Sequence, residues 1–242
     1  MDFIFAYDMV KEIMRETLPI SGNEVLSRED QDRLAMAALI AKMESSGSVI
    51  GTGRTAHVLR LEEYPHLCLK VITDRGISHN RVHKEMELLI AASAAGIAVP
   101  KPMYSMEEIG DSDYLCMQFI PGFSLKDLVE LDLAEKLPDQ FNFRQFFDLL
   151  RAQVKQMHEE ARLYHRDLHY GNVMVTDQGT PMIIDFGDGA VSRTSEDPYR
   201  TTNAKGELIV YPRDEDKINE TYRQVGNYLK EKRFFERRAN KI

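Results

Sequence analysis

The sequence predicts an α+β protein of two lobes: an antiparallel β-sheet with one helix, then a reduced, mainly helical lobe. Three observations indicate this. Short β-branched or apolar runs separated by turn residues begin at Val49. A long helix with an apolar stripe on one face is expected over residues 143–161. Pro121-Gly122 separates the β-rich part of the chain from the helical part, so we place the hinge there.

These elements divide the chain into three predicted domains. Residues 1–47 form a helical N-terminal extension, residues 48–120 the N-lobe, and residues 121–242 the C-lobe with its C-terminal helix. In the extension, one helix is expected to end before Pro19, because a proline disfavours the helical conformation in the residue before it. A second helix is expected from Ser27, whose hydroxyl oxygen suits an N-cap.

The predicted elements of the two lobes follow from the same signals. A helix over residues 81–95 is expected to end at Gly96, since glycine readily adopts the left-handed conformation of a C-cap. The other expected elements are strands in VIGTG, AHVLRLEE and LCLKVI, strands over 103–107 and 114–120, a short helix from Ser124, the runs NVMV and MIIDF on either side of a turn, and a final helix from about Asp214.

Composition and charge exclude several classes of protein. With 43% hydrophobic and 29% charged residues, the 242-residue chain suits a folded domain and not a disordered one. There are 39 acidic and 31 basic residues, so a nucleic-acid interface would need a local basic patch. The run from Lys230 to Ile242 is the candidate, although a solvated helix with docked phenylalanines is the simpler interpretation.

Targeting signals and cysteine usage point to a cytoplasmic protein. No apolar run approaches the length that a membrane span needs, and the N-terminus does not resemble a signal peptide. The chain has two cysteines, Cys68 and Cys116, with no CxxC motif. We therefore expect reduced thiols in a reducing compartment.

Two features of the N-lobe could bind phosphate. Gly51 and Gly53, in GTGRTAHV, lie between two predicted strands, where glycines let a hairpin approach phosphate oxygens; two glycines are also ordinary in a hairpin. Lys70 lies inside the apolar strand LCLKVI, and a buried ammonium needs a partner. Either Lys70 faces solvent, or Glu85 in the next helix holds it, with Glu87 as the partner if the helix register is shifted.

The strongest pattern is YHRDLHYGNVMV at residues 164–175, followed by IIDFG. Phosphoryl transfer needs a carboxylate to orient the attacking hydroxyl, metal ions to bridge the phosphates, and a fixed cation. Asp167, Asn172, Asp185 and Lys70 have the chemistry for these roles, because carboxylate and amide oxygens suit Mg²⁺ and an ammonium suits phosphate.

In this order, the motifs resemble those of the protein-kinase-like superfamily over about residues 48–190. The resemblance implies a bilobal protein-kinase-like fold that uses ATP and Mg²⁺. It implies Asp167 as the catalytic aspartate, with Asn172 and Asp185 holding Mg²⁺.

The same resemblance implies that Lys70 contacts the α- and β-phosphates and is held by Glu85. Met117 would be the gatekeeper, and the backbones of Gln118 and Ile120 would bond adenine. The residues that the resemblance places around the nucleotide are Gly51, Gly53, Val58, Cys68, Lys70, Met117, Gln118 and Ile120.

Departures from the common pattern narrow the family. His169 stands where protein Ser/Thr kinases usually carry lysine, and DLHYGN is closer to aminoglycoside- and choline-type kinases. Arg166 matches protein kinases, in which this arginine commonly pairs with a phosphate on the activation segment. Only 57 residues follow Asp185, and no A-P-E motif occurs among them. The chain is therefore more similar to the RIO kinases, the small kinase of the tRNA-threonylcarbamoyl complex, or compact bacterial effector kinases.

We accordingly expect a compact Ser/Thr kinase with a protein substrate, cytoplasmic or, for an effector, delivered into a host cytosol. A small-molecule kinase acting on an alcohol, and a nucleotide-binding pseudokinase, are the alternatives. A zinc hydrolase with His165, Asp167 and His169 as ligands is a further alternative. Candidate autophosphorylation sites after Gly189 are Ser192, Thr194, Ser195, Thr201 and Thr202.

Overall fold

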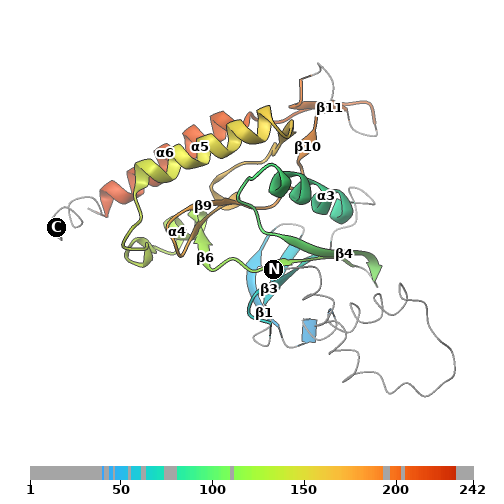
Figure 1. The fold of residues 1–242 in the computed structure, drawn as a ribbon, viewed down its shortest axis with the longest axis horizontal. Coiled ribbons are helices and arrows are strands. Elements are labelled where there is room, and N and C mark those ends of the chain that lie inside the picture. Colours follow the sequence, from blue (N-terminus) through green and yellow to red (C-terminus); the bar gives the residue numbers. More distant parts are fainter. Residues whose placement is uncertain are drawn as a thin grey trace. The chain divides into compact units, whose positions relative to one another are not determined.

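A computed structural model describes residues 40, 44–45, 47–53, 56–60, 64–73, 81–109, 112–192, 197–202 and 205–232 (Figure 1). The two helices expected before residue 47 and most of the basic C-terminal run lie outside these ranges. The chain forms two compact units, Met1–Met86 with Pro102–Phe119, and Glu87–Lys101 with Ile120–Ile242. The predicted domain boundaries stay predictions. Within the described ranges, no helix is both long and apolar enough to span a membrane.

The first unit is built on a five-stranded antiparallel sheet, as expected for the N-lobe. Its strand order is β1-β2-β3-β5-β4. The strands are β1 (Ser48–Thr52), β2 (Ala56–Arg60), β3 (Leu67–Ile72), β4 (Pro102–Ile109) and β5 (Ser112–Gln118). All six residues of β3 are buried, which explains why LCLKVI is nearly continuously apolar. Leu67, Leu69 and Val71 pack with Leu59 and Tyr114 in the core of this unit.

One helix, α3 (Arg81–Ala94), follows the first three strands. It ends as predicted at Gly96, whose φ of +77° lies in the left-handed region. The N–H of Ile97 donates to the carbonyl oxygen of Ala92 at 3.0 Å, which closes the last turn. Residues of α3 up to Met86 belong to the first unit and the remainder to the second.

The second unit has more helix than strand. Its helices are α4 (Leu125–Glu130), η1 (Ala134–Lys136), α5 (Phe143–Glu159), η2 (Tyr170–Asn172) and α6 (Asp214–Glu231). The N-cap Ser124 accepts the Asp127 N–H at 3.0 Å, and the Ser124 backbone N–H in turn donates to the Asp127 carboxylate, which completes a capping box.

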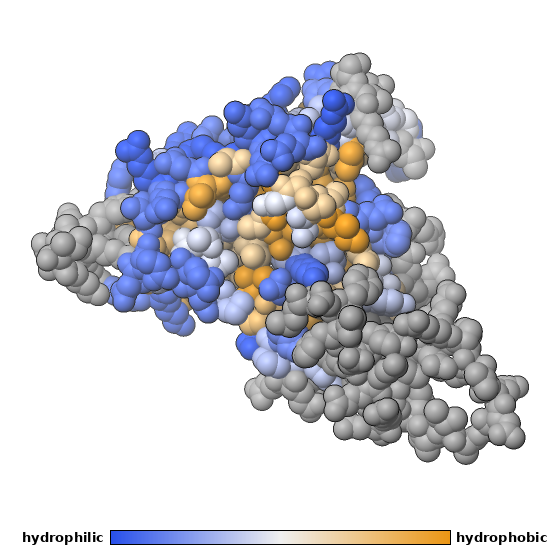
Figure 2. All heavy atoms as spheres, in the orientation of Figure 1, coloured by the Kyte–Doolittle hydropathy of each residue, from blue (hydrophilic) through white to orange (hydrophobic). Residues whose placement is uncertain are grey.

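Helices α5 and α6 pack side by side (Figure 1). The apolar stripe expected on α5 is half-buried at Phe143 and buried at its other five positions, which are Phe146, Phe147, Leu150, Val154 and Met157. The Phe143 ring lies 4.8 Å from the ring of Tyr222 on α6, centroid to centroid. The outer faces of these helices carry mainly hydrophilic residues, as the amphipathic pattern requires (Figure 2).

The segments between the helices of the second unit contain short strands that pair in small antiparallel sheets. The sheet β6-β8-β9 joins Gly122–Ser124, Val173–Thr176 and Pro181–Ile183, while β7 (Leu163–Tyr164) pairs with β10 (Ala190–Val191) and β11 (Arg200–Thr202) with β12 (Leu208–Val210). Gly122 has a φ of +145°, and a Cβ there would lie 2.2 Å from the Val175 carbonyl oxygen. The glycine of the predicted hinge is therefore required by a close backbone approach.

Candidate active site

Lys70 and Glu85 form a buried ion pair in the first unit. Lys70 Nζ lies 2.8 Å from both carboxylate oxygens of Glu85, and the side chains are only 9% and 2% exposed. Lys70 therefore does not face solvent, and its partner is Glu85 on α3, while Glu87 is exposed. Because the two groups are withdrawn from water together, loss of either would leave an uncompensated buried charge.

The glycine-rich hairpin joins β1 and β2. Gly51 pairs with Val58 across these strands, and the Gly53 N–H donates to the Ala56 carbonyl oxygen at 2.7 Å. Arg54 and Thr55 lie outside the described residues. The hairpin places Gly51, Gly53 and Val58 in one turn region, and their contact with a nucleotide stays a prediction.

Of the predicted adenine-binding residues, Met117 and Gln118 are the last two of β5, Cys68 lies on β3, and Ile120 follows β5. Cys68 pairs with Met117 across β3 and β5, and its thiol donates to the Gln118 carbonyl oxygen at 3.7 Å. Cys68 and Cys116 are free and buried, and burial raises the pKa of each thiol to about 12. Ile120 is buried and belongs to the second unit. The roles of these residues at adenine stay predictions.

His165 is buried at the start of the loop between β7 and η2. Its Nε2 lies 2.9 Å from the Ile184 carbonyl oxygen, and its Nδ1 accepts the Asp167 N–H at 3.3 Å. Both ring nitrogens are thus engaged by backbone groups, which makes the zinc alternative with His165, Asp167 and His169 wrong. Among the described residues, no group of three or more His, Cys, Asp or Glu side chains is arranged to hold a metal ion.

Asp167 and Asn172 are tied together within the same loop. Asn172 Nδ2 donates to the Asp167 carbonyl oxygen at 2.9 Å and lies 3.5 Å from its carboxylate Oδ2. Desolvation raises the pKa of Asp167, His169 and His165 oppose the rise, and Asp188 and Asp185 add to it. Sequence reasoning did not single out Asp188, although it directly extends the IDFG motif.

Asp185 is held in a left-handed backbone conformation, with a φ of +63°. Such a conformation is strained for a residue other than glycine, and strain of this kind gathers at functional sites. The following residue, Phe186, is fully buried, with its ring centroid 4.7 Å from that of His165. The Gly187 N–H donates to Asp185 Oδ1 at 3.4 Å, so a backbone group next to the buried Phe186 contacts the Asp185 carboxylate.

The donors of Asn172 and Asp185 fit a magnesium ion. Asn172 directs its Nδ2 to Asp167, which leaves the amide Oδ1 without a hydrogen bond among the described residues. Asp185 adds a carboxylate on an exposed residue. Oxygen ligands of these two kinds are what Mg²⁺ binds in proteins, usually together with phosphate oxygens and water.

The family model of the RIO domain matches residues 62–200, more than half of the chain. This chain belongs to the RIO domain family. The match confirms the predicted resemblance to compact atypical kinases of the RIO type. It also confirms the α+β, protein-kinase-like fold class, which agrees with the antiparallel sheet of the first unit and the helices of the second.

Relatives of this RIO domain include named kinases. The RIO-type serine/threonine-protein kinase Rio1 of Methanocaldococcus jannaschii is 30% identical over 129 residues, which cover 53% of this chain and 40% of the relative. Serine/threonine-protein kinase PknD of Chlamydia trachomatis is 31% identical over 130 residues, covering 50% and 14%. The chain thus spans less than half the length of these relatives.

Among solved structures, the kinase PK-1 of Cydia pomonella granulovirus is 13% identical, with a TM-score of 0.48. The match covers 66% of this chain and 60% of the viral kinase.

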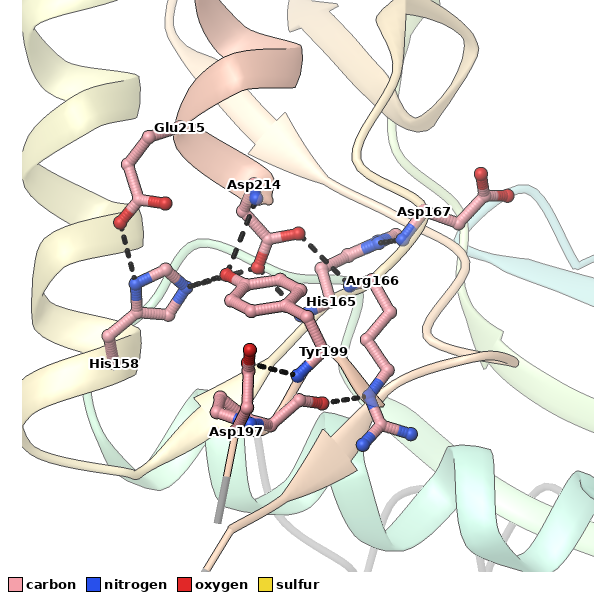
Figure 3. Close-up of polar contacts among 9 residues, drawn as sticks. His158, His165, Arg166, Asp167, Asp197, Tyr199, Asp214 and Glu215 are labelled. Atoms are coloured by element: carbon pink, nitrogen blue, oxygen red, sulfur yellow. Dashed lines mark hydrogen bonds and ion pairs between the residues drawn. The ribbon is translucent and has the colours of Figure 1, made fainter. Parts of the chain in front are cut away.

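The second unit also contains a buried carboxylate that sequence reasoning missed, Asp214, which follows the residues matched by the family model (Figure 3). Its Oδ2 accepts the His165 N–H at 2.9 Å, its Oδ1 accepts the Arg166 N–H at 3.0 Å, and His158 Nε2 lies 3.0 Å from Oδ2. Burial by itself would raise the pKa of Asp214, but hydrogen bonds and charges of His158 and His165 hold it below its ordinary value. Its only signal in the sequence is an acidic first turn of α6, which is ordinary at a helix start.

Arg166 also connects the loop to the segment after Gly189. It has a φ of +69°, its Nε donates to the Pro198 carbonyl oxygen at 2.6 Å, and its guanidinium lies 5.0 Å from the Tyr211 ring centre. Tyr199 lies beside it, with its hydroxyl 3.3 Å from His158 Nε2 (Figure 3). Arg166 thus contacts this segment through the Pro198 carbonyl oxygen and the Tyr211 ring. Of the candidate phosphorylation sites, Thr194 and Ser195 lie outside the described residues.

Proposed function

We propose that this RIO domain transfers the γ-phosphate of ATP to a serine or threonine hydroxyl of a protein substrate. The observation that carries the proposal is the buried Lys70–Glu85 pair, because an ammonium fixed at 2.8 Å from a carboxylate is the cation that this chemistry requires. The relatives that bear the name serine/threonine-protein kinase support the acceptor class.

In this proposal, Asp167 orients the acceptor hydroxyl and takes its proton. The hydroxyl oxygen bonds to the γ-phosphorus, the bond to the bridging β–γ oxygen breaks, and ADP leaves. The hydrogen bond from Asn172 Nδ2 to the Asp167 backbone supports the role, because it fixes the loop before the acceptor arrives. The raised pKa of Asp167 favours proton acceptance.

ATP and Mg²⁺ complete the proposed site. Asn172 Oδ1 and the Asp185 carboxylate would hold Mg²⁺, which offsets the charge of the phosphates when bound. Lys70 would contact the α- and β-phosphates. Gly51, Gly53 and Val58 would cover the phosphates, with Cys68, Met117, Gln118 and Ile120 around adenine. Two free, buried thiols support a reducing, cytoplasmic location.

A radiolabelled-ATP assay tests the proposal. The purified chain is incubated with Mg²⁺-ATP and either mixed proteins or a panel of small alcohols, with Asp167→Asn as the matched inactive variant. We expect label on serine or threonine of a protein, absent with the variant. Label on a small alcohol alone would favour a small-molecule kinase. Thermal stabilisation by ATP without its consumption would favour a pseudokinase.

A further inference from the structure

His169 caps the turn that carries Asn172. This residue is the N-cap of η2, and its ring Nδ1 accepts the Gly171 N–H at 2.9 Å. Its backbone carbonyl oxygen accepts the Asn172 N–H, also at 2.9 Å. Serine, threonine, aspartate and asparagine are the usual N-cap residues, so an imidazole in this place calls for an explanation.

The capping bond defines which ring nitrogen carries hydrogen. Because the Gly171 N–H donates to Nδ1, that nitrogen keeps its lone pair, and the ring hydrogen is on Nε2. Nε2 lies 3.7 Å from Asp167 Oδ2. One ring therefore holds the turn of Asn172 on one side and faces the carboxylate of Asp167 on the other.

Gly171 is adapted to this ring. A Cβ at Gly171 would lie 2.7 Å from His169 Cε1 and 3.0 Å from Nδ1, which is too close for the ring to stay in place. The φ of Gly171 is not positive, so its backbone conformation does not itself require glycine. The ring of His169 is what excludes a larger residue.

We propose that His169 is a positioning residue for phosphoryl transfer, with Gly171 as the space its ring requires. The ring fixes the turn of Asn172 through Nδ1 and directs the Nε2–H toward Asp167. His169 occupies the position of the usual lysine but has a different role, because a lysine has no acceptor for the Gly171 N–H. The catalytic part of this inference rests on the proposed function, while the capping part does not.

The capping part is tested by a double-mutant cycle on unfolding, which needs no activity. The full chain is compared with His169→Ala, Gly171→Ala and the double variant in urea. We expect Gly171→Ala to lower the urea midpoint in the natural chain and to lower it less beside His169→Ala, since the clash is then gone. Equal shifts in both backgrounds would overturn the inference.

A long-range ¹H–¹⁵N NMR spectrum of the histidine rings supplies a second check on the folded chain. We expect His169 to show an unprotonated Nδ1 and a protonated Nε2. A ring with the hydrogen on Nδ1 would contradict the capping bond.

The positioning part is tested by three substitutions of His169, with Gln178→Ala in an exposed turn as the matched control. Asn keeps an acceptor near the place of Nδ1, whereas Lys adds a cation without an acceptor. The Mg²⁺ concentration that half-saturates binding of a fluorescent ADP analogue is measured beside kcat. We expect His169→Ala and His169→Lys to raise the half-saturating Mg²⁺ concentration and to lower kcat, each by about 10- to 100-fold, which is the range for losing an outer-shell partner. His169→Asn should recover part of this loss.

A His169→Lys variant equal to the natural chain would overturn the positioning role and favour a cationic one. If the natural chain transfers no phosphate, the proposed function fails, and the unfolding cycle, the NMR spectrum and the ADP-analogue titration still decide the role of His169.

Discussion

The fully buried carboxylate of Asp214 accepts the backbone N–H of His165 at 2.9 Å, so the first turn of α6 holds the start of the loop that carries Asp167. The same carboxylate accepts the Arg166 N–H at 3.0 Å. Two backbone donors that would otherwise lack partners in the interior are thereby satisfied. The loop that carries Asp167 is consequently anchored from beneath, by a residue far along the chain.

Asp214→Asn should destabilise the fold and impair activity together. An amide would turn an N–H₂ group toward a backbone donor and weaken the contact with His158. We expect the free energy of unfolding to fall by about 3 kcal/mol, measured in urea. A variant as stable as the natural chain would contradict the anchoring role.

The pH dependence of stability gives Asp214 a separate signature. Its folded pKa lies below the ordinary 3.8, so its contribution is present above that value and is lost as the pH falls through the folded pKa. We expect the natural chain to lose stability below pH 3.8 more steeply than Asp214→Asn. Parallel acid-unfolding curves would show that Asp214 does not make this contribution.

Asp167→Asn should abolish phosphoryl transfer without unfolding the loop. The hydrogen bond from Asn172 Nδ2 to the backbone carbonyl oxygen of residue 167 does not depend on the carboxylate. We expect kcat to fall by roughly 10²- to 10⁴-fold, and the free energy of unfolding to change by less than about 0.5 kcal/mol. Near-natural turnover would remove Asp167 from the catalytic role.

Lys70→Met and Glu85→Gln should behave as changes to one unit. Each breaks a buried pair and should lower the free energy of unfolding by about 3–5 kcal/mol. Their double variant should lose less than the sum, by about 0.5–3 kcal/mol. Glu87→Gln, on the same helix but exposed, is the matched control. Additive losses in the cycle would show that the 2.8 Å contact does not couple the two residues.

Asp185→Ala should lower the affinity of the site for Mg²⁺, because a carboxylate ligand is lost. We expect the half-saturating Mg²⁺ concentration for nucleotide binding to rise by at least about tenfold. Asp185→Gly separates this loss from the backbone, since glycine relieves the strain at a φ of +63°. Asp185→Gly should raise the half-saturating Mg²⁺ concentration as much as Asp185→Ala does. Its free energy of unfolding should be higher than that of Asp185→Ala. An unchanged Mg²⁺ requirement in both would refute the metal assignment.

Local signals in the sequence were sufficient for much of the fold. The sequence predicted the long helix over residues 143–161, the short helix from Ser124 and the Gly96 C-cap, and the structure confirms them, with the long helix ending at Glu159. Each of these depends on residues within a few positions of one another, so the chain encodes them without knowledge of its long-range contacts. The order of the motifs likewise indicated the protein-kinase-like superfamily, with the RIO kinases as one of three compact groups, and the family model then identified the RIO domain.

Tertiary structure decided the contacts that connect distant segments. The sequence favoured Glu85 as the partner of Lys70 and kept Glu87 for a shifted helix register, and the rotation of α3 against β3 decides for Glu85. In the sequence, Asp214 is one of several acidic residues at a helix start, and only the packing of α6 places its carboxylate beside His165. In the sequence, His169 is a departure from lysine, and only the structure shows that its ring lies against Gly171. Helix rotation, burial and ring placement arise from packing between segments, which no local pattern records.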